Sequence, residues 1–356
     1  SRWSRGLGDV YKRQLGIIAV VVVGCFGIAP SGSWSQDGGN WPSFRGTRAR
    51  GVAEGHATPT DWNVESGENV VWRTPIPGLS HASPVIWGHR ICVTSAVPEG
   101  GDSPLKVGLY GDIQSVDDEG AHRWTVSCLD KRDGRVLWEE VAHAGVPKVK
   151  RHTKSTHANS TPATDGQYLV AFFGSEGLYT YDLDGNLQWK KDLGVLDAGF
   201  FVAPTAQWGF GSSPVIHEGR VLIQVDVLAE DFVAAFDASD GNELWRTPRE
   251  EVPTWSSPTV YEVGDVTRVA VNGWKHSGAY DFETGKPVWW FKGGGDIPVP
   301  TPIVAHDLIF ITNSHGSANP IFAIRTDAQG DISLPGDKTS SEFVAWGKWR
   351  DGAYMP

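Results

Sequence analysis

The stretch that decides the fold is Ala279–Trp289, with the sequence AYDFETGKPVW. Asp281 can bond its own backbone two residues on, and Gly285 can take the positive φ that a tight turn requires. Val288 and Trp289 then resume an extended apolar run. The stretch therefore predicts a strand end, a tight turn and the start of a second strand.

The same unit occurs three more times. Cys128–Trp138 (CLDKRDGRVLW) and Ala235–Trp245 (AFDASDGNELW) keep the eleven-residue spacing. Thr180–Trp189 (TYDLDGNLQW) is one residue shorter in its turn. A strand–turn–strand piece that recurs in this way indicates a repeat array.

A Ser/Thr-Pro dipeptide opens an apolar strand upstream of the repeated unit, at Ser83-Pro84, Thr161-Pro162, Ser213-Pro214, Ser257-Pro258 and Thr301-Pro302. The fourth repeat shows the whole pattern, with strands predicted near Pro258–Tyr261, Val266–Asn272, Ser277–Phe282 and Pro287–Lys292. Four short strands with tight turns form a meander, and a repeated meander is typical of a propeller blade. The sequence predicts an all-β fold, a β-propeller of four-stranded antiparallel blades with about five blades present.

These residues also carry a family resemblance. The pattern A-x-D-x-x-T-G-x-x-x-W in Ala279–Trp289 resembles the tryptophan-docking repeat of quinoprotein-like β-propellers. That group includes quinone-dependent dehydrogenases and the outer-membrane assembly factor of the BamB type. Trp41–Gly46 (WPSFRG) and Ile324–Trp346 resemble a bacterial branch called PQQ-binding-like repeat proteins. The resemblance covers roughly Trp41 to Pro356 and is specific for the fold.

The resemblance implies that the Trp near the end of each repeat docks between blades. We expect five such indoles to be mostly buried: Trp138, Trp189, Trp245, Trp289 and Trp346. A large aromatic ring buries more area than other side chains, so these contacts should dominate the packing of the blades.

The chain divides into four segments by composition. Residues 1–14 include Asp9–Gln14 (DVYKRQ), which GAT GTG TAT AAG AGA CAG encodes, the mosaic-end adaptor of transposase-based sequencing libraries; we interpret this segment as an artefact. Residues 15–36 form a signal-peptide region. Residues 37–69 are Gly-rich and polar, and we expect them to wrap the outside of the fold. Residues 70–356 form the propeller.

The signal region predicts export to the periplasm or cell envelope. Leu15–Gly24 is an apolar run with the length of a signal h-region, too short to span a bilayer. Val22–Cys25 resembles a weak lipobox, which would make Cys25 a lipid anchor. Cleavage after Ser33–Ser35 is the alternative, and we favour it over lipidation.

Both ends of the repeat region suggest an incomplete ring. Val70–Arg73 has the pattern of a fourth blade strand, but no first three strands precede it. Gly352–Pro356 resembles the loop that opens a sixth repeat. We therefore expect an open ring that belongs to a seven- or eight-bladed propeller, truncated at its C-terminus.

Charge and cysteine usage narrow the function further. The chain has a net charge of −11, which argues against nucleic acid as a partner because phosphates need a basic surface. Cys92 and Cys128 fall on neighbouring predicted strands of repeat one. They could form a disulfide in an oxidising compartment, but two buried thiols are the interpretation we favour.

Ligands of propellers meet the face formed by the loops before the innermost strands and between strands two and three. The sequence places nine candidate residues of an interaction rim in those loops: His81, His157, Asn159, Phe210, Trp255, Trp274, Lys275, His276 and His315. The four histidines could build a metal or acid–base site, although solvated loop histidines are the more common case. We assign no catalytic, cofactor-binding or metal-binding residue.

One basic cluster, Arg151–His157 (RHTKSTH), precedes the second repeat. It could dock an anionic partner or anionic lipid, although an ordinary solvated loop is the more common case.

Two functions remain from different classes. We favour an exported non-enzymatic scaffold that binds a protein or peptide partner in the cell envelope and has no cofactor. The alternative is a fragment or relative of a PQQ-dependent dehydrogenase that binds the quinone and Ca²⁺. The resemblance implies adjacent cysteines beside the quinone in such enzymes, and this chain has no Cys-Cys pair.

Overall fold

A computed structural model describes residues 39–53, 55, 58–100, 105, 115–116, 120–295, 297–313 and 319–352. The chain divides into two units, residues 1–37 and 38–356, and only the second contains described residues. The predictions for the adaptor segment, the signal region and Cys25 therefore lie outside the described residues. No described helix is long and apolar enough to cross a membrane.

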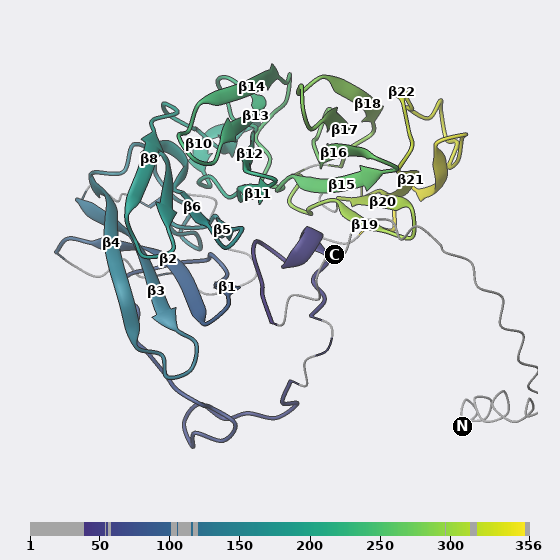
Figure 1. Cartoon of the computed structure of the whole chain (residues 1–356). Coiled ribbons are helices and arrows are strands. Elements are labelled where there is room, and N and C mark those ends of the chain that lie inside the picture. The colour runs from purple at the N-terminus through teal and green to yellow at the C-terminus, as the bar shows by residue number, and fades with distance from the viewer. Residues whose placement is uncertain are drawn as a thin grey trace, which may run out of the picture. The chain divides into compact units, whose positions relative to one another are not determined.

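The described part of the chain forms five successive antiparallel meanders (Figure 1). Blade one comprises β1 (Val85–Trp87), β2 (Arg90–Pro98), β3 (His122–Asp130) and β4 (Val136–Gly145); blade two, β5 (Ala163–Thr164), β6 (Tyr168–Phe172), β7 (Leu178–Asp182) and β8 (Leu187–Lys191); blade three, β11 (Val215–His217), β12 (Arg220–Val225), β13 (Phe232–Asp237) and β14 (Glu243–Pro248); blade four, β15 (Thr259–Val263), β16 (Val266–Val271), β17 (His276–Asp281) and β18 (Pro287–Lys292); and blade five, β19 (Ile303–Ala305), β20 (Leu308–Thr312), β21 (Ile321–Arg325) and β23 (Val344–Lys348).

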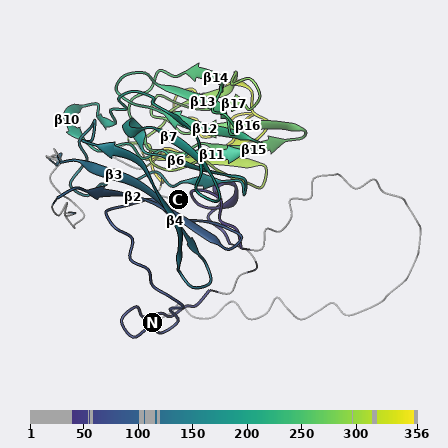
Figure 2. The ribbon, with the colours of Figure 1, turned by 60° about the vertical axis from the view of Figure 1, so that its left-hand side comes forward.

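The first strands of successive blades contact one another, from β1 through β5, β11 and β15 to β19. They therefore form the inner side of the array, and the fourth strands lie outside. In Figure 2, β2, β3 and β4 of blade one run alongside one another. This is the blade arrangement of a β-propeller, so the all-β prediction is confirmed.

Two additions lie between or beside the blades. A hairpin of β9 (Gly199–Phe200) and β10 (Ala203–Gln207) joins blades two and three. The segment between β21 and β23 carries β22 (Gly330–Asp331), which pairs in parallel with β18 as a fifth strand of blade four. Most of the segment between β2 and β3 lies outside the described residues.

The hydrophobic core lies between neighbouring blades. In β18, Trp289 and Phe291 are buried while Trp290 and Lys292 alternate outward, as the period of two in a strand requires. Phe291 packs against Phe322 of blade five, with ring centroids 4.6 Å apart. Each blade thus buries its faces against the next blade.

The Ser/Thr-Pro dipeptides link the blades near their inner strands. The Ser83 N–H donates to Thr161 Oγ1 over 2.9 Å, and the Thr161 N–H donates to Ser213 Oγ over 3.0 Å. The Ser213 N–H donates to Ser257 Oγ over 2.9 Å, and the Ser257 N–H donates to Thr301 Oγ1 over 3.4 Å. We call this series the hydroxyl ladder. It explains why each repeat carries a hydroxyl residue at this position.

The strand-end indoles link the blades again at their outer edge. Three of them donate from Nε1 to a carbonyl in the turn of the following blade: Trp138 to Leu183 (3.0 Å), Trp189 to Ala238 (2.8 Å) and Trp245 to Phe282 (2.9 Å). The glycine of that turn lies under the ring. Gly285 has a φ of 68°, and a Cβ there would come within 2.4 Å of the Trp245 ring. The turn therefore needs glycine for its conformation and for the space under the indole.

Three other tryptophans depart from this pattern. Trp72 donates to Lys131 O over 2.9 Å and covers the turn of blade one, but residues 70–73 form no strand, contrary to expectation. Trp289 is 1% exposed and donates to the Tyr261 hydroxyl over 3.1 Å. Trp346 is 42% exposed, so the prediction of burial is wrong there. In the described part of the chain, no turn of a following blade covers the Trp346 ring.

The N-terminal segment does not wrap only the outside, as the sequence suggested. Trp41 exchanges two backbone hydrogen bonds with Ile86 of β1, and Pro42 O accepts the Thr164 N–H over 2.8 Å. The short 3₁₀ helix η1 (Thr47–Ala49) contacts β15 and β19. The inner strands leave backbone groups without a sheet partner, and part of this segment pairs with them.

Cys92 and Cys128 lie directly opposite each other on β2 and β3, with Cα atoms 4.1 Å apart. The structure joins them in a disulfide, so the interpretation as two separate thiols is wrong. Strand spacing alone did not reveal the register that makes them neighbours.

We expect this disulfide to be detectable by peptide mapping. Alkylation of the denatured protein without reductant should leave Cys92 and Cys128 unmodified, and prior reduction should expose both, because a disulfide sulfur is not a nucleophilic thiolate. Mass spectrometry of the tryptic peptides measures the difference. Alkylation of both residues before reduction would contradict the assignment.

The hydroxyl ladder predicts a stability effect at Ser213. Ser213→Ala removes the acceptor of the Thr161 N–H, which is a buried group, and should cost about 1–3 kcal/mol. Ser213→Thr is the matched control, since it keeps the hydroxyl and threonine occupies two other positions of the ladder. The shift of the urea-unfolding midpoint measures both. An Ala variant as stable as the Thr variant would show that the ladder does not contribute.

Candidate functional site

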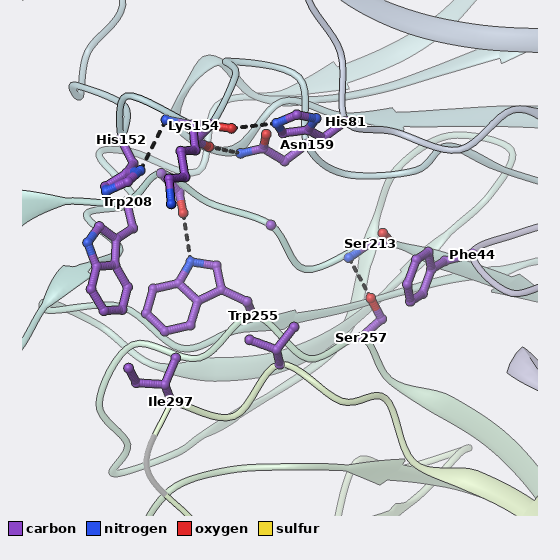
Figure 3. Close-up of a pocket in the computed structure, with 14 residues that line it drawn as sticks. Phe44, His81, His152, Lys154, Asn159, Trp208, Ser213, Trp255, Ser257 and Ile297 are labelled. Atoms are coloured by element: carbon purple, nitrogen blue, oxygen red, sulfur yellow. Dashed lines mark hydrogen bonds between the residues drawn. The ribbon is translucent and has the colours of Figure 1, made fainter. Parts of the chain in front are cut away.

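A cavity of about 660 Å³ opens where the loops before the first strands of the five blades converge (Figure 3). Blade one contributes one residue, and blades two to five contribute the rest together with one residue of the N-terminal segment. The lining residues are Phe44, His81, His152, Lys154, Ser155, Asn159, Trp208, Gly209, Gly211, Ser213, Trp255, Ser257, Ile297 and Val299. Because Ser213 and Ser257 also belong to the hydroxyl ladder, the inter-blade contacts hold the cavity wall in place.

Two indoles form the aromatic wall of the cavity. The Trp208 and Trp255 ring centroids are 5.3 Å apart, and Trp255 Nε1 donates to Gly209 O over 2.8 Å. Phe200 of the β9–β10 hairpin stacks on Trp208, with centroids 4.9 Å apart and planes 9° apart. Both indoles are therefore fixed in orientation before any ligand binds.

The aromatic contacts continue from this wall to a second loop. Phe200 contacts Phe201 at 5.4 Å, and Phe201 contacts Trp274 at 5.3 Å. We call the series from Trp255 through Trp208, Phe200 and Phe201 to Trp274 the aromatic row. It joins two aromatic residues that the sequence placed in separate loops of the predicted rim.

Polar groups form the opposite side of the cavity. His81 Nε2 donates to Lys154 O over 2.6 Å, and the Lys154 N–H donates to His152 Nδ1 over 3.1 Å. The Asn159 amide donates to Phe210 O over 3.0 Å. No Asp or Glu is among the lining residues, so the ionisable groups of the described cavity are one lysine and two histidines.

Other predicted rim residues lie outside this cavity. His157 packs against His122, with centroids 5.1 Å apart, and its carbonyl accepts the Trp124 indole N–H over 3.0 Å. His157 and Phe210 instead line a small pocket of about 20 Å³, in which Asn159 also takes part. His315 lies outside the described residues.

The loop of Trp274, Lys275 and His276 is held by one buried carboxylate. Glu251 accepts the backbone N–H groups of all three residues over 3.0, 3.0 and 2.7 Å, in that order. The guanidinium of Arg249, also buried, lies 3.7 Å from the Glu251 carboxylate. These backbone contacts fix the position of Trp274 at the far end of the aromatic row.

Burial is the main cause of the pKa shifts of Glu251 and His276. It raises the pKa of Glu251 above the ordinary value, and the Arg249 guanidinium and the amides of Lys275 and His276 oppose the shift. Burial also lowers the pKa of His276, helped by Lys292, Arg249 and Lys275. The His276 ring is therefore neutral near pH 7.

The predicted histidines do not form a metal centre in the described chain. Among the described residues, no group of three or more His, Cys, Asp or Glu side chains could hold a metal ion. Three of these histidines lie in different environments. His81 lines the large cavity, His157 packs against Trp124, and His276 lies beside Glu251.

Of the fourteen lining residues, His81, Asn159 and Trp255 were among the rim candidates. Phe44, Lys154 and Trp208 are among those that were not. Phe44 belongs to the WPSFRG motif, which the sequence placed outside the fold. Lys154 belongs to the basic cluster. In that cluster Arg151 is buried and donates to Ser155 O over 2.9 Å, so only the middle of the cluster faces the cavity.

The chain matches a known protein family. A family model described as outer membrane protein assembly factor BamB matches residues 34–196, 121–289 and 229–328, together more than half of the chain. The chain belongs to this family. It is a PQQ-like propeller repeat protein. No curated protein matches it significantly.

Solved structures resemble the chain at low sequence identity. BamB from Moraxella catarrhalis is 14% identical with a TM-score of 0.46 over 73% of this chain and 65% of that structure. A europium-containing methanol dehydrogenase is 12% identical with a TM-score of 0.48 over 71% and 50%. The quinohemoprotein alcohol dehydrogenase ADHIIG from Pseudomonas putida HK5 is 14% identical with a TM-score of 0.49 over 82% and 47%. The chain thus spans less than two thirds of each of these structures.

We expect Glu251 to control the Trp274 loop. Glu251→Ala removes the acceptor of three N–H groups, so amides 274–276 should exchange hydrogen about 10- to 100-fold faster, as a loss of roughly 1.5–3 kcal/mol implies. Glu243→Ala is the control, because Glu243 lies on the exposed side of β14 and pairs with Arg246. Exchange followed by mass spectrometry measures both. Unchanged exchange at 274–276 in Glu251→Ala would contradict this role.

Proposed function

We propose that this chain is an exported, non-enzymatic β-propeller scaffold that binds a protein or peptide partner in the cell envelope. The observation that carries the proposal is the cavity with its aromatic wall, built from one loop of each blade. Tryptophans held in a fixed orientation are the side chains most enriched at the energetic centres of protein interfaces. The aromatic row extends this surface from Trp255 to Trp274 and gives it more than one anchor.

The family supports an envelope location. Its model is described as an outer membrane protein assembly factor, and the protein from Moraxella catarrhalis carries the same name. The proposal for this chain therefore includes export to the periplasm or envelope. Attachment through a lipid on Cys25 is a further option.

A relative of PQQ-dependent dehydrogenases is the second candidate, because the repeat in Ala279–Trp289 resembles that of quinone-dependent dehydrogenases. Their cofactor pair, as the family resemblance implies it, needs carboxylate ligands for Ca²⁺ and adjacent cysteines beside the quinone. The described residues of the cavity do not fit this pair, because no carboxylate is among them. The two bonded cysteines of blade one are 36 residues apart in sequence. Absorbance and dye reduction after addition of PQQ and Ca²⁺ would test this candidate.

The scaffold proposal predicts a mutation-sensitive interaction. The purified chain should recover a partner from a solubilised envelope fraction, and Trp255→Ala should reduce the recovered amount about tenfold or more, since a central aromatic anchor contributes roughly 2 kcal/mol or more. Trp274→Ala should weaken recovery less, because it lies at the end of the aromatic row.

Trp62→Ala is the matched control. This indole is 64% exposed and is not among the lining residues of the cavity, so its loss should leave recovery unchanged. Equal recovery by all three variants would place the partner elsewhere on the chain.

A further inference from the structure

The chemistry of the cavity indicates what kind of segment it binds. Lys154 is the one lysine in its lining, and no described carboxylate pairs with its ammonium group. Figure 3 shows its side chain extending toward the side of the cavity where Trp208 and Trp255 lie. A cation beside an apolar wall attracts a group that carries a negative charge next to an apolar body.

The rest of the wall is apolar and rigid. Ile297 and Val299 also line the cavity, and Ile297 lies near the two indoles (Figure 3). Ile297 has a φ of 52°, a backbone conformation that is unfavourable for a β-branched residue. The backbone N–H of Trp255 donates to Pro298 O over 2.9 Å and holds this segment in place. Strained backbone of this kind concentrates at binding sites.

The charges that line the cavity favour a negatively charged ligand. The chain as a whole carries a net charge of −11, but the described residues of the cavity lining include a lysine and two histidines and no carboxylate. An acidic partner segment would be repelled by most of the surface and attracted here. A basic segment would meet only like charge in the cavity.

We infer that the cavity binds an acidic–apolar segment of the partner protein, with a large apolar side chain between Trp255 and Ile297 and an adjacent carboxylate on the Lys154 ammonium. The volume of about 660 Å³ is in the range of sites that enclose ligands of this size. The inference rests on the proposed scaffold function and specifies its partner.

Three synthetic peptides test this directly with the full chain. In the first, a Phe is flanked by two Glu; in the second, the Glu are replaced by Lys; in the third, the Phe is replaced by Ala. Titration followed by tryptophan fluorescence should show binding of the Glu-Phe-Glu peptide at least about tenfold tighter than either other peptide. The Lys peptide loses the charge-assisted hydrogen bond to Lys154, and the Ala peptide loses the apolar side chain that the indoles would bury. Equal affinity for all three peptides would overturn the inference.

Protein variants separate Lys154 from general charge effects. Lys154→Gln should weaken the Glu-Phe-Glu peptide about tenfold and remove most of the salt dependence, because the ammonium supplies the pairing charge. Lys190→Gln makes the same charge change at an exposed position of β8 outside the cavity and should bind as the parent does. Equal weakening by both variants would overturn the assignment to Lys154. The Lys154 ammonium makes no hydrogen bond or ion pair with the described residues, so its loss should not disturb folding.

Two further outcomes distinguish the possible failures. If phenylacetate binds with Lys154 dependence and no peptide binds, the site takes a small free acid and the peptide assignment is wrong. If an envelope partner is recovered in a Trp255-dependent way but is insensitive to Lys154→Gln, this inference fails while the proposed function stands.

Discussion

The structure depends on hydrogen bonds that join each blade to the next at two places, one near the first strands and one at the outer edge. Near the first strands, the hydroxyl of one Ser/Thr-Pro dipeptide accepts the N–H of the preceding one. At the outer edge, an indole donates to the turn of the following blade. Because both contacts cross from one repeat to another, no blade satisfies its own polar groups alone.

The hydroxyl ladder also positions the loops that line the cavity. Each loop before a first strand ends at a hydroxyl residue of the ladder, so the ladder fixes where that loop leaves the sheet. Ser213 and Ser257 belong to the ladder and line the cavity at once. The cavity is therefore formed by the packing of blades and not by a mobile loop that must close. This arrangement suits recognition, because little conformational entropy is lost when a partner binds.

The cavity combines an aromatic wall with a cationic side chain. The hairpin between blades two and three brings Phe200 and Phe201 between Trp208 and Trp274, which gives the aromatic row its continuity. Lys154 supplies a cation on the opposite side, where the described lining residues include no carboxylate. In the recognition that we propose, the apolar wall would provide affinity and the Lys154 ammonium would select the sign of the partner's charge.

The sequence by itself determined the blades, because strands, turns and their glycines follow from residues close together in the chain. The four predicted strands of repeat four match β15–β18 within two residues, and the spacing from Asp281 to Trp289 indicated both the turn and the indole. The loops before the first strands were also identified from the sequence, which is why His81, Asn159 and Trp255 were candidates for the cavity.

Only the tertiary structure decided which groups meet across repeats. The acceptor of each ladder N–H lies 44 to 78 residues away, a distance at which sequence patterns carry no pairing information. The same holds for Cys92 and Cys128, whose pairing depends on strand register, and for Trp41, whose segment runs along the inner strands. Lys154 could not be told from its neighbours in a basic cluster, because the tertiary packing of this loop decides that Arg151 is buried and that Lys154 lines the cavity.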